Sequence, residues 1–490
     1  MKRAGILTAL AFAFGVLASA AAASAQETQT VPGAASTPPP AGAPRTVQYP
    51  TPVATTLPNG LRVLAVRVPG SALVAADLTI PGGAVADPDA TPGVASLTAS
   101  LLTRGAAKRS AKDVAFALDA LGATLVAVPN NDRTDVITDA VSARFPAALA
   151  LLADAVRRPA FTPAELVLAK QRATSSVTLQ SGSPSALANL VVQRALFAGA
   201  FGRPTSGTAQ SIAAIDRDAV VAYHRAHYRP DGAILTIGGD LTPTDAFALA
   251  QIAFGDWSAP PGSASTPAPA VAAAPRVVVV DQPAAGRTAI VVARAGPLRT
   301  SADWAAATVG NAVLSGYSGR LNEEIRVKRG LSYGAGSMYA SGRYAGSIVA
   351  STLVEHAKAS EALDIMLSTI SSLGSGAPAT AGELSARRTS MLGAMAAGLE
   401  TIGGIVRGVA LNAFAGLPLD ALTSAPAALN AVEPAAVTRF AAAGMSTPPT
   451  IVLVGDSSKF IDAVRKSHPG LVFVKATDLD LTSPGLARVP

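Results

Sequence analysis

The residues best suited to act together on a substrate are Arg326 and Tyr333, seven positions apart in the stretch N-E-E-I-R-V-K-R-G-L-S-Y at residues 322–333. A guanidinium and a phenol directed at one carbonyl group can polarise it and stabilise the negative charge that develops on its oxygen during nucleophilic attack. Taken alone this spacing is common, because a solvated helix residue followed by a packed strand residue also produces it. The chemistry of the pair therefore depends on its surroundings.

A histidine pair suggests a second kind of chemistry, metal binding. His224 and His227 lie three positions apart, a spacing that suits two ligands on one helix. However, the chain has only four histidines and no cysteine, and no third ligand is evident. Aromatic residues and a proline surround the pair at residues 223–232, which favours packing and turn formation. His356, at an expected strand-to-helix junction, is expected to be a surface residue.

A serine nucleophile and a phosphate-binding loop are two further alternatives, and both lack their signatures. No G-x-S-x-G nucleophile elbow is present, since G-Y-S-G at residues 316–319 breaks the spacing. Ser96 and Ser100 have no general base near them in sequence, and a serine without a base is inert. The G-A-G at residues 334–336 is not followed by G-K-[ST], so it predicts no phosphate loop.

The N-terminus has the pattern of a secretory signal peptide. Lys2 and Arg3 precede an apolar run, and A-S-A at residues 23–25 forms a small-residue cleavage site before Gln26. The alternative is an uncleaved membrane anchor, because residues 4–25 are almost long enough to span a bilayer. The absence of cysteine excludes a lipid-modified N-terminal cysteine, disulfides and thiolate metal sites. We therefore expect residues 1–25 to direct the protein to the periplasm.

Composition excludes two classes of partner. The net charge of +7 falls to +5 when Lys2 and Arg3 leave with the signal peptide, because that segment contains no acidic residue. Charged residues make up only 14% of the chain, too few to build the basic surface of a nucleic-acid-binding protein. After signal cleavage no apolar run reaches membrane-spanning length, so we expect no stable membrane span. The remaining length requires more than one core.

Two Pro-rich stretches divide the mature chain into similar halves. Residues 26–52 read as a Pro/Ala-rich leader and residues 258–275 as a linker, leaving halves at 53–257 and 276–490. Each half has the same order of expected elements: two strands, two helices, two strands, two longer helices, and finally a helix and an apolar strand ending in Gly-Asp. In the first half these are strands 61–68 and 73–80, helices 93–102 and 111–121, strands 124–129 and 133–141, and helices 145–157 and 163–178. In the second half they are strands 276–281 and 288–293, helices 302–314 and 320–328, strands 331–340 and 343–352, and helices 357–373 and 381–399. The chain is therefore expected to be an internal duplication.

The sequence G-V-A-S-L-T-A-S-L-L-T-R-G at residues 93–105 resembles the zinc-site helix of the pitrilysin/insulinase peptidases, the inverzincins, whose signature is H-x-x-E-H. In that frame Ser96 and Ser100 replace the two ligand histidines and Ala99 replaces the general-base glutamate. The family's third ligand, a glutamate on a later helix, falls at Ser175 and Ser176. Serine and alanine supply neither zinc ligands nor a base. The resemblance therefore implies a member without a metal and inactive alone.

The second half resembles another part of the same machinery. The context G-x-x-G-R-L…R…G-L-x-Y around Arg326 and Tyr333 is similar to the family's arginine/tyrosine pair, with the arginine on a helix and the tyrosine on the following strand. The resemblance extends over about residues 55–474. It implies an α+β, duplicated two-lobed metallopeptidase-like fold, in which each lobe is a mixed or antiparallel sheet flanked by helices.

The resemblance implies the metal-free subunit of a heterodimeric zinc metallopeptidase. A homologous H-x-x-E-H partner subunit would supply zinc and the base, while Arg326 and Tyr333 would bind the carbonyl of an extended peptide substrate. No cofactor is expected in this chain. The alternative is a catalytically inactive scaffold member, comparable to the family's core proteins of respiratory complexes, although a pure scaffold has no chemical reason to hold the pair. A third possibility, an independent hydrolase, has little support from the residues present.

Overall fold

The structure is a computed structural model that describes residues 49–262, 270–444 and 446–487. The expected signal peptide at residues 1–25 and nearly all of the expected leader at 26–52 lie outside the described residues, as does the middle of the expected linker. No single described helix is long and apolar enough to cross a membrane, although one sharply bent pair, Ala381–Gly398 with Ile402–Phe414, reaches the required length and composition together.

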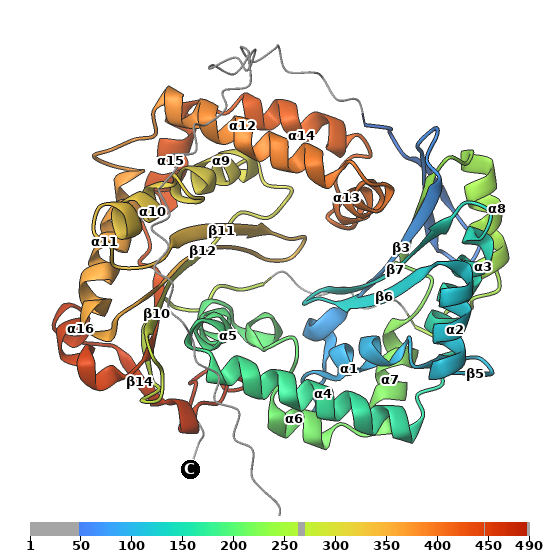
Figure 1. Cartoon of the computed structure of the whole chain (residues 1–490), viewed down its shortest axis with the longest axis horizontal. Helices are drawn as coiled ribbons and strands as arrows, with labels where there is room; N and C mark the ends of the chain where they lie inside the picture. The colour runs from blue at the N-terminus through green and yellow to red at the C-terminus, as the bar shows by residue number, and fades with distance from the viewer. Residues whose placement is uncertain (1–48, 263–269, 445, 488–490) are drawn as a thin grey trace, which may run out of the picture. The chain divides into compact units, whose positions relative to one another are not determined.

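Two six-stranded mixed sheets form the framework, one in each half (Figure 1). The first sheet has the order β1-β2-β8-β3-β7-β6, and the second has the order β11-β12-β10-β13-β9-β14. The strands of the first sheet are β1 (Val53–Thr56), β2 (Arg62–Arg67), β3 (Leu73–Pro81), β6 (Thr124–Pro129), β7 (Arg133–Val141) and β8 (Ile234–Gly239). Those of the second are β9 (Val277–Asp281), β10 (Thr288–Ala295), β11 (Ala335–Ser341), β12 (Gly346–Val354), β13 (Thr450–Gly455) and β14 (Val472–Lys475).

Strand order and direction confirm the duplication. In the first sheet β2 runs parallel to β8, and β8, β3, β7 and β6 follow one another antiparallel. In the second sheet β9 runs parallel to β13, and the strands β13, β10, β12 and β11 are likewise paired antiparallel in that order. The two six-stranded sheets differ only at one edge, where the first sheet adds β1 antiparallel to β2 and the second adds β14 parallel to β9. The α+β fold with two sheet-and-helix lobes is therefore confirmed.

Helices flank both sheets, and several begin at threonines whose hydroxyls accept the first free backbone N–H groups. Thr162, Thr242 and Thr380 cap their helices in this way. The helices of the first half are α1 (Val94–Leu101), α2 (Ala111–Leu121), α3 (Phe145–Arg157), α4 (Pro163–Gly182), α5 (Pro184–Leu196), α6 (Ala209–Ala214), α7 (Arg217–His227) and α8 (Pro243–Phe254). Those of the second half are α9 (Trp304–Leu314), α10 (Arg320–Asn322), α11 (Ala359–Ser372), α12 (Ala381–Gly398), α13 (Ile402–Phe414), α14 (Ala421–Asn430), α15 (Pro434–Gly444) and α16 (Ile461–Ser467).

The two halves exchange one helix each. Helix α5 of the first half packs on β10 and β13 of the second sheet, and helix α13 of the second half packs on β3 and β8 of the first sheet (Figure 1). Because side chains alternate along a strand, one face of β3 belongs to the core of its own half while the opposite face meets α13. Both faces of the central strands are thus covered, which explains why these strands are almost continuously apolar.

Gly238 on β8 allows α13 to approach the first sheet closely. A Cβ atom at this position would lie 2.5 Å from Val406 Cγ2 and 3.2 Å from Ile402 Cδ1, both on α13. Such a contact is too short for any side chain to occupy without displacement. Gly238, in the G-G-D sequence at the end of β8, therefore allows the two halves to pack closely.

Buried charges accompany this helix contact. Arg407 on α13 places its guanidinium 3.5 Å from Asp77 Oδ2 and 3.3 Å from Asp135 Oδ2. Arg133 Nε donates to both Asp135 oxygens, at 3.1 and 3.2 Å. Asp77 and Asp135 are fully buried, and burial, together with the neighbouring Asp135 charge, raises the pKa of Asp77 to about 7. One of two adjacent buried carboxyl groups therefore holds its proton in weak acid.

This titration predicts a pH-dependent stability. Between about pH 4 and pH 7 the folded chain keeps the Asp77 proton that the unfolded chain has released, so stability falls as the pH rises through this window. Asp77→Asn removes the titration. We expect the denaturant midpoint of this variant, relative to that of the wild type, to rise steadily from about pH 5 to pH 8. A difference between the two midpoints that does not change with pH would contradict this assignment.

Several local features differ from expectation. Residues 331–334 form a loop, so Tyr333 precedes β11 rather than lying on it, because β11 begins only at Ala335. The expected helix at 320–328 is one α-helical turn followed by a π-helix at Glu323–Val327. β1 was not expected, nor were α5 and α13, which are apolar on more than one face because they pack between the halves.

Candidate functional site

The helix that resembles a zinc-site helix is held in place without any metal ligand. Gly93 precedes α1 with φ 97°, a left-handed conformation suited to glycine. Asp87 caps the helix by accepting hydrogen bonds from the backbone N–H groups of Gly93 at 2.5 Å and Ala95 at 2.9 Å. Burial raises the pKa of Asp87 to about 7 against the opposing effect of these two hydrogen bonds. The Asp87 cap therefore fixes the start of this helix.

The side chains at the ligand positions are engaged elsewhere or apolar. Ser96 donates to the Thr205 carbonyl at 2.7 Å and Ser100 donates to the Leu97 carbonyl at 2.8 Å, while Ala99 is fully buried. Ser175 and Ser176 lie exposed on α4, a helix that contacts α1. Within the described part of the chain, no three His, Asp or Glu side chains gather closely enough to hold a metal ion. These residues do not fit zinc.

We expect the purified protein to hold no stoichiometric zinc, because neither hydroxyl nor methyl groups bind it tightly at neutral pH. Metal analysis after dialysis against a weak chelator measures this directly. A content of about one zinc per chain, lost in the His224→Ala or His227→Ala variant, would contradict the prediction and make the histidine pair a metal site.

His224 and His227 serve packing on α7. The His224 ring stacks on Tyr228 at 4.7 Å between centroids and meets Phe161 edge-on at 5.3 Å, and its Nε2 lies 2.7 Å from the Val156 carbonyl oxygen. His227 lies against Tyr223, with centroids 4.5 Å apart. Burial lowers the pKa of both histidines and favours the neutral rings. The packing role inferred from the neighbouring aromatic residues therefore agrees with their surroundings.

His356, expected at the surface, is half-buried and is bonded through both ring nitrogens. Its Nδ1 lies 2.8 Å from Thr288 Oγ1, and its Nε2 lies 3.0 Å from the Ala285 carbonyl oxygen. A carbonyl only accepts, so Nε2 carries the proton and Nδ1 accepts from the threonine hydroxyl. His356 thereby joins the β9–β10 connection to the start of α11.

Arg326 lies on the π-helix at Glu323–Val327. Here the Lys328 N–H bonds to the Glu323 carbonyl at 2.9 Å, one residue farther back than in an α-helix. Single π-turns of this kind are frequent at functional sites. Ile325 anchors the turn in the core with no exposed surface, and this leaves the neighbouring Arg326 side chain partly exposed.

Tyr333 is 82% exposed, although the loop that carries it is well anchored. The Ser332 hydroxyl donates to the Leu353 carbonyl at 2.8 Å. Asn322, which is buried, donates from Nδ2 to the Tyr317 carbonyl at 2.5 Å and accepts at Oδ1 from the Ala335 N–H at 3.4 Å. A rigid loop that presents an exposed phenol suits a group that contacts a ligand.

Two further side chains belong to this surface and were missed from sequence. The Arg326 guanidinium lies 5.0 Å from the centroid of the Tyr317 ring, and that of Arg287 lies 5.7 Å from the centroid of Tyr333. Among the described residues, no hydrogen bond or cation–aromatic contact joins Arg326 to Tyr333 directly. Arg326 therefore contacts Tyr317, and Tyr333 contacts Arg287. In both pairs the aromatic ring orients the guanidinium. The only feature of the sequence that could have indicated Tyr317 was the pair of glycines that flank it, in G-Y-S-G at residues 316–319.

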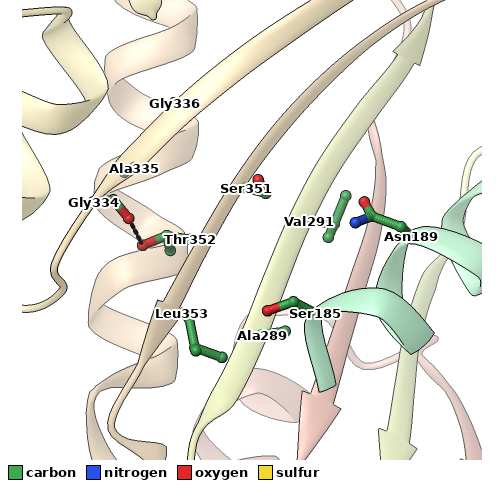
Figure 2. Close-up of a pocket in the computed structure, with 10 residues that line it drawn as sticks. All are labelled: Ser185, Asn189, Ala289, Val291, Gly334, Ala335, Gly336, Ser351, Thr352 and Leu353. Carbon is green, nitrogen blue, oxygen red and sulfur yellow. Dashed lines mark hydrogen bonds between the residues drawn. The ribbon is translucent and has the colours of Figure 1, made fainter. Parts of the chain in front are cut away.

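A cavity of about 310 Å³ lies beside the Tyr333 loop. Figure 2 shows its lining: Ser185 and Asn189 come from α5, and Gly334 to Gly336 continue from the loop into β11. The Thr352 hydroxyl donates to the Gly334 carbonyl at 3.0 Å, the contact drawn as a dashed line. The exchanged helix α5 thus forms one wall, so the first half contributes polar groups close to the Tyr333 loop.

Two family descriptions match consecutive parts of this chain. Residues 62–209 match "Insulinase (Peptidase family M16)" and residues 214–391 match "Peptidase M16 inactive domain". Proteins named uncharacterized zinc protease are similar to it: the one from Mycobacterium leprae is 25% identical over 286 residues and the one from Streptomyces coelicolor 26% over 296 residues. These alignments cover 57% and 59% of this chain and 64% of each relative, less than two thirds of the relatives' length.

Solved structures share the fold. A peptidase M16 inactive domain from Pseudomonas fluorescens superposes with a TM-score of 0.77 at 24% identity, covering 82% of this chain and 97% of that one. A protease from Helicobacter pylori gives 0.76 at 17% identity, with 83% and 100% covered. A chain of complex III2 from Candida albicans gives 0.70 at 15% identity, with 84% and 98% covered. Together with the family matches on both halves, these likenesses show that the chain belongs to the pitrilysin/insulinase (M16) peptidase family.

Proposed function

We propose that this protein is the metal-free subunit of a two-chain zinc metallopeptidase that degrades peptides. The observation that carries the proposal is a combination. Ser96 and Ser100 stand at the positions of the zinc-binding histidines and Ala99 at that of the base, while Arg326 is partly exposed and Tyr333 is exposed on an anchored framework. A homologous partner subunit with H-x-x-E-H supplies zinc and the base. This chain supplies the two donors that bind the substrate carbonyl.

The surroundings of the pair support this division of labour. Arg326 is held by a π-turn and steered by the Tyr317 ring, and Tyr333 is held by the Ser332 and Asn322 hydrogen bonds. Donors that are fixed before the substrate arrives need no reorganisation when charge develops on the carbonyl oxygen. Holding two solvent-accessible polar side chains in place has no evident value for stability, because polar groups at the surface contribute little to it.

The compartment we propose is the periplasm, on the basis of residues 1–25. Fractionation of the native host with an antibody against the chain tests this. Recovery with the periplasmic enzymes, in a form that begins at Gln26, is the expected result, and recovery with the cytoplasm would contradict it.

The test of the function is reconstitution. The purified chain, a purified H-x-x-E-H homologue from the same host, and their equimolar mixture are assayed with a quenched fluorescent peptide. We expect activity only in the mixture. Sedimentation of the mixture should show a heterodimer, because a stable interface between two subunits buries on the order of 1,600 Å². Full activity of the homologue alone, unchanged on mixing, would contradict the proposal.

A scaffolding role is the second candidate, favoured by the fold shared with a chain of complex III2 from Candida albicans. It predicts a stable complex whose activity does not depend on Arg326 or Tyr333. Kinetics of the Tyr333→Phe and Arg326→Ala variants distinguish the two roles.

A further inference from the structure

A second cavity, of about 530 Å³, lies between helices α12, α13 and α14 and the β11–β12 turn. Figure 1 shows these helices grouped beside β11 and β12. Its walls are largely apolar, with Met395, Leu399, Leu411, Phe414 and Leu422 among the lining residues. The volume is in the range of pockets that bind small molecules or the end of a peptide.

Four arginines and no acidic residue line this cavity in the described part of the chain: Arg133, Arg299, Arg343 and Arg407. The guanidinium of Arg299 lies 3.7 Å from the centre of the Trp304 ring, and none of the described residues accepts a hydrogen bond from it. Burial lowers the pKa of Arg299. A half-buried cation without an anionic partner has donors to offer a ligand.

Arg343 presents a second guanidinium to the same cavity. It lies 5.4 Å from the centre of the Phe414 ring and donates from Nη1 to the Phe414 carbonyl at 3.1 Å. The aromatic ring and the carbonyl orient the group without neutralising it. Arg299 and Arg343 are therefore fixed in position and uncompensated.

The other two arginines of the cavity form ion pairs with aspartates that do not line it. Arg133 contacts Asp132 at 3.2 Å and Asp135 at 3.1 Å, and Arg407 contacts Asp77 and Asp135. Four arginines stand beside three aspartates, and one of these, Asp77, is only partly ionised at neutral pH because its pKa is raised to about 7. The site therefore has an excess of positive charge, which an anionic ligand reduces, and an apolar body fits the walls.

We propose that this cavity binds an apolar molecule that ends in a carboxylate, held by the guanidinium groups of Arg299 and Arg343. The C-terminus of an apolar peptide and a fatty acid share this chemistry. Arginine binds a carboxylate through two parallel N–H···O bonds, a geometry that an amide of the same shape cannot match. This proposal does not rest on the proposed peptidase role, because neither Arg326 nor Tyr333 lines the cavity.

Binding is measured by calorimetry on the purified mature chain with three probes. These are acetyl-Ala-Ala-Leu-Phe with a free carboxylate, the same peptide as its C-terminal amide, and decanoate. We expect at least one carboxylate probe to bind and the amide to bind about 10- to 100-fold more weakly, as loss of a charged hydrogen bond implies. Which of the two carboxylates binds identifies the source as a peptide end or a fatty acid.

Two variants and a matched control complete the test. Arg299→Ala should weaken carboxylate binding about 10- to 100-fold. Ala394→Glu places a negative charge on an exposed lining position of α12 and should abolish it without unfolding the chain. Arg104→Ala removes an exposed arginine outside the cavity and should change nothing. Equal binding of peptide acid and amide, no binding of either carboxylate at millimolar concentration, or unchanged affinity in Arg299→Ala would overturn the proposal.

Discussion

Tyr333→Phe is expected to slow peptide hydrolysis by the reconstituted two-chain complex about a hundred- to a thousand-fold, since a donor aimed at the developing oxyanion is typically worth about 3–4 kcal/mol. The change removes one hydroxyl and keeps the ring that Arg287 covers. The loss should appear in kcat as well as in kcat/KM, because in the proposed role the hydroxyl acts mainly in the transition state. Steady-state kinetics with the quenched peptide measure both.

Arg326 should behave in the same way. Arg326→Ala removes the charge, and Arg326→Lys keeps the charge but loses the planar fork, so both variants should be impaired if the guanidinium geometry matters. Tyr339→Phe is a matched control on β11, since its hydroxyl donates to the Pro297 carbonyl and serves the fold. Its kinetics should stay near those of the wild type.

The binding of the two subunits and the zinc content of the partner must be measured in every variant. Full activity of both Tyr333→Phe and Arg326→Ala at unchanged complex stability would exclude the carbonyl-binding role and favour scaffolding. Loss of activity together with loss of the complex would instead make the pair part of the subunit interface, which also contradicts the proposed role.

Asp135→Ala is expected to lower the free energy of unfolding by about 3–5 kcal/mol, because removing one partner of a buried ion pair leaves the other charges uncompensated. Asp135 has no exposed surface and accepts hydrogen bonds from Arg133, Arg407 and Asn130. Since Arg407 comes from the opposite half, the change also weakens the contact that holds α13 on the first sheet. Denaturant unfolding with an unchanged m-value measures the loss.

Asp462→Ala is the control for this comparison. Asp462 is almost fully exposed and pairs with the exposed Arg465 at 3.6 Å, so its loss should cost less than about 1 kcal/mol. Similar effects of Asp135→Ala and Asp462→Ala would show that the buried network contributes no more than a surface pair, contrary to the prediction.

The sequence alone was sufficient for the features that depend on local pattern. Strands β6 and β7 and helices α2 and α3 begin and end at the residues predicted, because alternation, a Ser110 cap and a Gly122 C-cap are short-range signals. The duplication was visible because both halves repeat one order of elements. The expected loss of two zinc ligands at Ser96 and Ser100 and of the base at Ala99 also rests on residue identity, since no fold can turn a hydroxyl into an imidazole or a methyl group into a carboxylate.

The tertiary structure alone decided how the halves combine and how the site is presented. The exchange of α5 and α13 and the buried contact of Arg407 with Asp77 and Asp135 join residues far apart in the chain. The contact of Arg326 with Tyr317 joins the π-helix to the turn that precedes it. The π-turn and the late start of β11 likewise follow from anchoring by buried Ile325 and Asn322. Such contacts depend on packing between elements, and packing overrides local propensity without leaving a periodic signal in the sequence.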